Sequence, residues 1–265
     1  MSDSLRILCL GDVVGKPGVQ GIRRQLPAWR RELGADFVIC NAENAVDGSG
    51  LIPSTAKHLV HAGCDVLTSG DHIYKRPEAQ SCLAKPEVLR PANFPDGGPG
   101  RGWDAYDCDG HRIGVINLMG QVFMRPCDNP FRLVESAMAD LSDCELVVVD
   151  MHAEATSEKA AMAHFLDGRV SAVFGTHTHV ATADEQILAG GTGFITDIGM
   201  CGPHDSILGR RTDAVVTAMS TWQQRPFTVA KADVRLNGVL FTCAGRACTH
   251  VERVRLHCPP PAAHG

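Results

Sequence analysis

The stretch Ala172-Val173-Phe174-Gly175-Thr176-His177-Thr178-His179 joins an apolar run, typical of a buried strand, to two histidines spaced two residues apart. Because alternate residues of an extended segment face the same way, we expect His177 and His179 on one face. Two imidazoles on one face suit a metal ion, whereas a single histidine at a strand end is more often structural. Taken alone, the stretch leaves metal binding and a structural role equally open.

Runs typical of strands and of helices alternate along the rest of the chain. Strands are predicted at residues 5–10, 37–40, 66–68, 112–118, 146–150, 172–175 and 193–196, and helices at 18–33, 53–62, 131–141 and 157–166. The C-terminal part, 227–256, is expected to form three strands. This alternation predicts an α/β fold with much parallel pairing. We expect a single domain over residues 1–258 and a disordered tail over 259–265.

Polar residues that can bind a metal follow five of the predicted strands. They are Asp12, Glu43 with Asn44, Asp71 with His72, Asp150 with His152, and His177 with His179. In open α/β sheets, ligands bind beyond the carboxyl ends of the strands. Each residue alone has a plainer explanation, such as the tendency of a Gly-Asp pair to form a turn. Convergence of five strand ends favours a metal site over coincidence.

Six of these residues are candidate metal ligands: Asp12, Glu43, Asp71, His152, His177 and His179. Mixed carboxylates and imidazoles suit iron, manganese or zinc better than calcium or magnesium alone. Six ligands are too many for one ion, and a bridging carboxylate can serve two. Two ions roughly 3.5–4 Å apart can hold a hydroxide between them and clamp the oxygens of an in-line phosphoryl displacement. The set therefore predicts a binuclear phosphoesterase.

Three competing motifs fail. The segment Gly11–Pro17 is short of P-loop spacing and lacks Ser or Thr after Lys16. His152-Ala-Glu154 imitates the His-x-Glu of zinc deaminases, but the required Pro-Cys-x-x-Cys is absent from the sequence. The sequence also lacks the Gly-x-Ser-x-Gly elbow of α/β-hydrolases.

The composition is that of an ordinary globular protein. A net charge of −5 gives no electrostatic argument for nucleic acid as a bulk partner, although RNA stays open as a substrate. The 11 scattered cysteines show no Cys-x-x-Cys pair and are interpreted as small buried hydrophobes in a reducing compartment. Neither a signal peptide nor an apolar run of about 18 residues is evident. We therefore expect a cytoplasmic protein with no membrane partner.

Together these residues resemble the calcineurin-like metallophosphoesterases, and most closely their YmdB-like branch, over roughly residues 5–245. The motifs that carry the resemblance are Gly11-Asp12-Val13-Val14-Gly15-Lys16-Pro17-Gly18, Asn41-Ala42-Glu43-Asn44, Leu89-Arg90-Pro91-Ala92-Asn93, the segments 150–158 and 167–173, Gly175-Thr176-His177-Thr178-His179-Val180 and Thr182-Ala183-Asp184-Glu185. The resemblance implies a four-layer α/β/β/α sandwich of two mixed sheets flanked by helices. It also implies hydrolysis of phosphodiesters such as cyclic nucleotides, iron or manganese as the metal with zinc still open, and a homo-oligomer.

The resemblance further implies roles for the candidate residues. Asp12, Glu43 and His179 would hold one ion, and Glu43, Asp71, His152 and His177 the other. Val14 stands where the wider superfamily often has a histidine, and the YmdB-like branch is similar in lacking it. His72 would act as general acid or orient the phosphate, and Asn44 would contact the phosphate or order the site.

One departure concerns Asp71, because the branch usually reads Gly-Asn-His where this chain reads Gly70-Asp71-His72. Asp is a good oxygen ligand, so the site is retained, but it adds a negative charge that should raise the pKa of the attacking water. We therefore predict that Asp71→Asn shifts the acidic limb of the pH–rate profile to lower pH. A profile of kcat/KM against pH checks this, and a limb that stays in place or moves to higher pH would contradict it.

Three other hypotheses remain open from the sequence. The same fold could carry a phosphomonoesterase or 5′-nucleotidase. The chain could instead be a regulatory binding protein whose hydrolysis is slow or vestigial, for which Asp71 is the single hint. A purely structural α/β protein would require all five strand ends to be coincidence.

Overall fold

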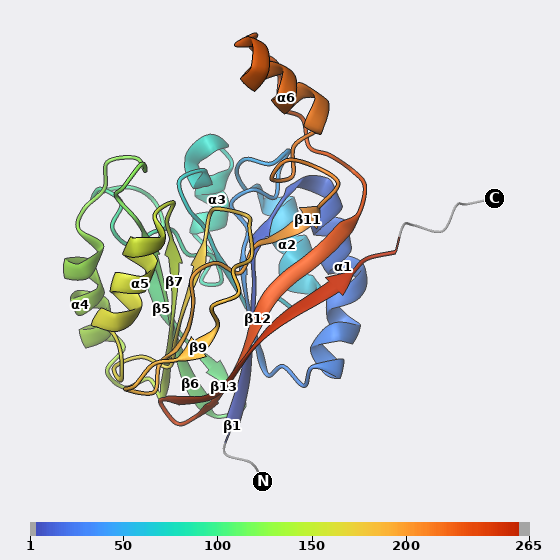
Figure 1. The fold of residues 1–265 in the computed structure, drawn as a ribbon. Helices are drawn as coiled ribbons and strands as arrows, with labels where there is room; N and C mark the ends of the chain where they lie inside the picture. Colours follow the sequence, from blue (N-terminus) through green and yellow to red (C-terminus); the bar gives the residue numbers. More distant parts are fainter. Residues whose placement is uncertain (1–3, 260–265) are drawn as a thin grey trace.

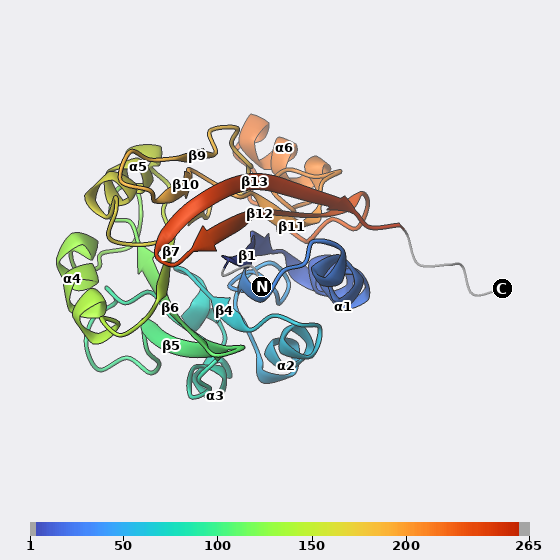
Figure 2. The ribbon, with the colours of Figure 1, turned by 90° about the horizontal axis from the view of Figure 1, so that it is seen from below.

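In the computed structural model, which describes residues 4–259, two β-sheets pack face to face and helices cover both outer faces (Figures 1 and 2). The first sheet has seven strands in the order β2-β11-β12-β1-β3-β4, with β13 added to β12. Their bounds are β1 Ser4–Leu10, β2 Asp12–Val13, β3 Phe37–Asn41, β4 Val66–Thr68, β11 Met200–Pro203, β12 Val234–Ala244 and β13 Ala247–His257. β1, β3 and β4 run parallel, whereas β12 is antiparallel to β1, β11 and β13.

The second sheet has six strands in the order β5-β6-β7-β8-β10-β9. Their bounds are β5 Trp103–Cys108, β6 His111–Met119, β7 Leu146–His152, β8 Ala172–Thr176, β9 Gln186–Ile187 and β10 Gly193–Ile195. The four inner strands are parallel, and β5 and β9 pair with them in antiparallel fashion. Both sheets are therefore mixed, as expected.

On the two outer faces, α1 and α2 lie against the first sheet and α4 and α5 against the second, whereas α6 projects away from both (Figure 1). Their bounds are α1 Gly15–Glu32, α2 Pro53–His61, α3 Ala79–Leu83, α4 Pro130–Asp140, α5 Thr156–Phe165 and α6 Thr212–Thr221, with a 3₁₀ turn, η1, at Ile73–Lys75. In α2, Pro53 occupies the first turn and Gly63, with φ 106°, follows the helix end. Proline costs no hydrogen bond there, and glycine adopts the left-handed conformation without strain.

Strand alternation builds the layers. In β1, Leu8 and Leu10 pack under α1 and α2, while Ile7 and Cys9 face the other sheet. Because successive side chains of a strand point to opposite faces, the apolar residues Ile7–Leu10 of this one strand contribute to two separate cores. β7 does the same on its side of the molecule. The expected four-layer α/β/β/α sandwich is confirmed.

The expectation of three C-terminal strands is wrong. β12 and β13 are two strands of 11 residues each that form one long hairpin. Residues 227–233 precede them without joining the hairpin, because β12 is already paired by β1, β11 and β13. The sequence patterns also failed to predict β5, β11 and α6. The expected tail, 259–265, lies outside the described residues except for Pro259.

All 11 cysteines are free thiols, and 10 of them are buried, which confirms their interpretation as small core residues. No helix within residues 4–259 is both long enough and apolar enough to cross a bilayer.

Candidate metal centre

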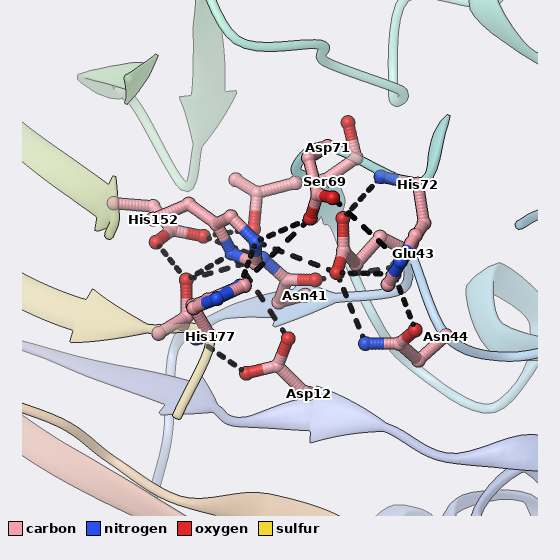
Figure 3. Close-up of polar contacts among 12 residues, drawn as sticks. Asp12, Asn41, Glu43, Asn44, Ser69, Asp71, His72, His152 and His177 are labelled. Atoms are coloured by element: carbon pink, nitrogen blue, oxygen red, sulfur yellow. Dashed lines mark hydrogen bonds and ion pairs between the residues drawn. The ribbon is translucent and has the colours of Figure 1, made fainter. Parts of the chain in front are cut away.

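The carboxyl ends of strands from both sheets meet at one place between the sheets (Figure 3). Each predicted ligand lies at or just past such an end: Asp12 in β2 after β1, Glu43 after β3, Asp71 after β4, His152 as the last residue of β7, and His177 with His179 after β8. Parallel strands bring their carboxyl ends to the same sheet edge, which explains why residues so distant in sequence converge.

Four of the six side chains form a tight group. One ligand atom from each of Glu43, Asp71, His152 and His177 lies within 4.8 Å of all the others. The Nε2 atom of His152 is 3.4 Å from Glu43 Oε1, 3.6 Å from Asp71 Oδ1 and 3.1 Å from His177 Nδ1. The structure therefore brings together the four residues that the family resemblance assigns to one ion.

The other predicted set lies beside this group. The Nε2 atom of His179 is 3.8 Å from Asp12 Oδ1, and Asp12 Oδ1 is 4.0 Å from His152 Nδ1. The side-chain amide of Asn44 lies 3.0 Å from Glu43 Oε1 and 3.2 Å from His179 Nε2. Asn44 thus connects Glu43 of the first set to His179 of the second.

Two buried carboxylate oxygens show that this group suits a cation. Oδ1 of Asp12 and Oδ1 of Asp71 are buried and have no hydrogen-bond partner among the described residues. A buried carboxylate oxygen without a partner is costly, and native proteins rarely tolerate it without compensation. A metal ion bound to these two oxygens of Asp12 and Asp71 would supply the partner that they lack.

Each of the three histidines has one ring nitrogen engaged away from the group. Nδ1 of His152 is 2.9 Å from the Thr176 hydroxyl, and Nδ1 of His179 is 3.1 Å from the Leu208 carbonyl oxygen. Nε2 of His177 is 3.3 Å from a carboxylate oxygen of Glu154. Metal-binding histidines are usually oriented by an acceptor at the second nitrogen. The remaining nitrogens all face the group, as ligation requires.

The sequence-based reason for pairing His177 with His179 is wrong, although both residues reach the site. β8 ends at Thr176, and both histidines have positive φ, 98° and 66°. They lie in a turn rather than on one face of an extended segment. The turn directs His177 toward His152 and His179 toward Asp12, so the two imidazoles serve different sides of the group.

The charges in the group are strongly coupled. Burial disfavours the charged form of Glu43, yet the imidazoles of His152 and His72 hold its pKa well below the usual range. Burial likewise opposes protonation of His152, but Glu43 and Asp71 raise its pKa well above normal. Burial and the His152 ring lower the pKa of His177 to about 4, so its imidazole is neutral and able to ligate. A metal ion and a proton would compete for Nε2 of His152, the ring nitrogen that faces the group. Metal binding must therefore release that proton.

His72 and Asn44 lie at the open side of the group. The His72 side chain is 31% exposed, whereas those of His152 and Glu43 are fully buried. His72 Nδ1 is 3.0 Å from Asn44 Oδ1 and 3.2 Å from Glu43 Oε1. Its hydrogen bond and charge interaction with Glu43 raise the pKa of His72 against the effect of burial. An accessible, readily protonated imidazole can deliver a proton to a reacting group.

Asp150, which the sequence placed among the residues that can bind a metal, instead belongs to a second ring of polar residues behind the ligands, and sequence reasoning missed its contacts with Thr68 and Thr176. Asp150 accepts hydrogen bonds from the hydroxyls of Thr68 and Thr176 at 2.6 and 2.7 Å, and from the Asn41 amide at 3.1 Å. Thr176 in turn holds His152. The available signal was a threonine at the last position of two otherwise apolar strands, β4 and β8. Such a threonine has to find a buried partner.

The four-layer sandwich and a carboxylate–imidazole group at its strand ends define the metallophosphoesterase class of enzymes. The profile of the YmdB-like protein family matches residues 8–254. The chain belongs to this family, as its motifs led us to expect.

Similar proteins agree with this assignment. The chain is 41% identical over 239 residues to a 2′,3′-cyclic-nucleotide 2′-phosphodiesterase of Bacillus subtilis (strain 168), a match that covers 89% of this chain and 90% of that protein. The crystal structure of a hypothetical protein from Thermus thermophilus superposes with a TM-score of 0.92 at 36% identity, covering 96% of this chain and 100% of that one. The crystal structure of a novel phosphatase from Mycoplasma pneumoniae superposes with a TM-score of 0.91 at 33% sequence identity. This match covers 98% of this chain and 96% of that one. With the metal-binding group, these findings make the chain a hydrolase of phosphoric esters of the phosphodiesterase kind.

Proposed function

We propose that this enzyme hydrolyses 2′,3′-cyclic nucleotides with two transition-metal ions, iron or manganese, with zinc still open. The observation that carries the proposal is the convergence of six candidate ligands, in which His152, His177 and His179 each turn one ring nitrogen toward the group while a neighbour engages the other. The Bacillus subtilis relative supports the substrate class. The free thiols support a reducing, cytoplasmic location.

In this proposal, Asp12, Glu43 and His179 hold one ion, and Glu43, Asp71, His152 and His177 hold the other. When bound, the ions would supply an activated water and Lewis-acid stabilisation of the phosphoryl oxygens. The chain's own residues orient the ligands for these ions. Thr176, Glu154 and the Leu208 carbonyl hold the three imidazoles in place, so little rearrangement is needed for ligation.

His72 and Asn44 act on the substrate side. As water attacks phosphorus and the bond to one ribose oxygen breaks, the His72 imidazolium gives a proton to that oxygen, and a phosphomonoester remains. Asn44 orients His72 through its side-chain oxygen and keeps its amide directed between Glu43 and His179. From this position, Asn44 contacts the phosphate or orders the site around it.

The test is elemental analysis of the purified protein, followed by assays with Mn²⁺ and with Fe²⁺. We expect bound metal and turnover of 2′,3′-cyclic nucleotides and bis-p-nitrophenyl phosphate, with slower turnover of p-nitrophenyl phosphate. Faster hydrolysis of the monoester would favour the 5′-nucleotidase hypothesis. Metal binding without turnover of any ester would favour a regulatory binding protein. Short RNA is included because the charge of the chain does not exclude it as a substrate.

We further propose that the enzyme is a homo-oligomer joined through α6, which stands apart from the body of the molecule (Figure 1). Its one buried residue is Val215, while Met219 and Trp222 are 73% and 92% exposed. A lone helix of this length is marginal in water and needs packing to persist. We predict that Met219→Gln with Trp222→Gln lowers the molar mass measured by light scattering to that of a monomer. A wild-type protein that is already monomeric would contradict the proposal.

A further inference from the structure

The turn that carries His177 and His179 is held by a buried ion pair outside the metal-binding group. Thr178, between the two histidines, donates to Asp197 Oδ2 from its backbone N–H at 3.2 Å and from its hydroxyl at 2.8 Å. Lys159 of α5 places its ammonium 2.7 Å from the same oxygen. We infer that Asp197, fixed by Lys159, is the positioning residue that aims both histidines at the metal. This inference rests on the ligand roles proposed above.

The turn needs such a clamp, because both histidines are in the left-handed region, with φ of 98° and 66°. Non-glycine residues there are strained and persist only when the surrounding structure enforces the conformation. Two hydrogen bonds to one carboxylate oxygen restrain the backbone between them. These two bonds therefore help to hold the strained conformation of the histidine on either side of Thr178.

Asp197 also connects to a third ligand. Its Oδ1 accepts from the backbone N–H of Gly199 at 2.8 Å, and the carbonyl oxygen of Gly199 accepts from the N–H of Asp12 at 3.1 Å. The N–H of His177 in turn donates to Asp12 Oδ2 at 3.0 Å. One carboxylate thus links His177, His179 and Asp12 through short chains of hydrogen bonds.

The burial of the pair argues for a role beyond stability. The Lys159 and Asp197 side chains are 0% and 1% exposed, and every other Lys or Arg ion pair among the described residues is far more exposed. Burying two charges costs enough desolvation that apolar residues are often as stable. A retained buried pair is therefore better explained by the geometry that it imposes on Thr178.

Gly175, which opens the Gly-Thr-His-Thr-His stretch, makes room for this pair. A Cβ at Gly175 would lie 2.6 Å from Cδ of Lys159 and 1.8 Å from the carbonyl oxygen of Thr196. Any larger residue would displace the lysine stem. The glycine is therefore part of the clamp, because it lets Lys159 reach from the outer helix layer to the turn.

The experiment compares Asp197→Asn, Lys159→Met and Thr178→Val with the control Leu141→Ala. Leu141 is buried beside Gly114, near the amino ends of β6 and β7 and away from the metal-binding group, so its loss lowers Tm without touching the turn. The readouts are Tm, the Kd for Mn²⁺ by calorimetry, and the visible spectrum of the Co²⁺-loaded protein. None of the three depends on turnover.

We expect Asp197→Asn and Lys159→Met to weaken Mn²⁺ binding by about 10–100-fold and to change the Co²⁺ spectrum. Thr178→Val, which keeps the ion pair and removes one hydroxyl bond to a carboxylate, should weaken binding about tenfold with little change in Tm. The control should bind Mn²⁺ like the wild type despite its lower Tm.

Variants that bind Mn²⁺ as tightly as Leu141→Ala would overturn the inference. If Asp197→Asn does not fold, Thr178→Val decides, because it leaves the buried charges paired. A wild-type protein that binds no Mn²⁺ would contradict the proposed function and this inference together. Tight wild-type binding with unchanged variants would contradict the inference alone.

Discussion

Glu43→Gln is expected to lower kcat/KM for a phosphodiester by about 10³-fold or more and to leave the purified protein with little metal. Glu43 is fully buried, its Oε1 lies 3.4 Å from His152 Nε2 and 3.0 Å from the Asn44 amide, and it is the residue proposed to serve both ions. An amide of the same shape lacks the negative charge that a ligand shared by two cations must supply. The loss amounts to several kcal/mol of transition-state stabilisation, because both metal positions are weakened at once.

The matched control is Glu32→Gln, which makes the same chemical change at an exposed position at the end of α1. Its metal content and kcat/KM should equal those of the wild type. Circular dichroism should show both variants folded. A Glu43→Gln protein that keeps its turnover while its metal is depleted would refute the proposed mechanism.

Gly70→Ala is expected to lower kcat/KM by about 10²-fold or more, although it adds a single methyl group. A Cβ at Gly70 would lie 2.1 Å from Nε2 of His152 and 2.5 Å from Oε2 of Glu43. These are two of the proposed ligands, and both are fully buried, so an added methyl group would displace them from the group. Metal content should therefore fall together with turnover.

Gly34→Ala is the control. Gly34 is needed for its backbone conformation, whereas Gly70 is needed because its neighbours leave no room for a side chain. Gly34 has φ +58°, and its nearest neighbour would lie 3.6 Å from an added Cβ. Alanine there should cost about 1–2 kcal/mol in stability through its left-handed backbone, with no effect on the metal. If Gly70→Ala instead behaves like Gly34→Ala, losing stability but keeping metal and kcat, the packing of the site differs from the one described.

The ligands could be identified from sequence because each stands at the end of a recognisable strand. The apolar runs around Leu8, Val148 and Val173 mark those strands, and the residue that follows a parallel strand must lie at the ligand-binding edge of its sheet. Asp12, Glu43 and His152 follow from this rule alone. The rule depends only on strand direction, so it needs no knowledge of packing.

The residues that hold the ligands could not be found in this way. Lys159 belongs to a helix that was predicted without any role for this lysine, and Asp197 follows a short strand with no motif around it. Glu154 and Thr176 belong to motifs that were recognised in the sequence, but the motifs do not reveal their partners. Tertiary packing brings Glu154 to His177 and Thr176 to Asp150. A hydrogen bond between residues 38 positions apart leaves no periodic trace.

The α/β class, the positions of most of the main strands and the six candidate ligands could therefore be predicted from sequence, because side-chain periodicity and strand ends are local properties of the chain. The directions in which His177 and His179 point, one toward His152 and the other toward Asp12, depend instead on the packing of the folded chain. Their segment is a strained turn rather than a strand, and its conformation depends on Asp197, Lys159 and Gly175. These contacts join separate layers of the fold, and no local preference of the chain specifies them.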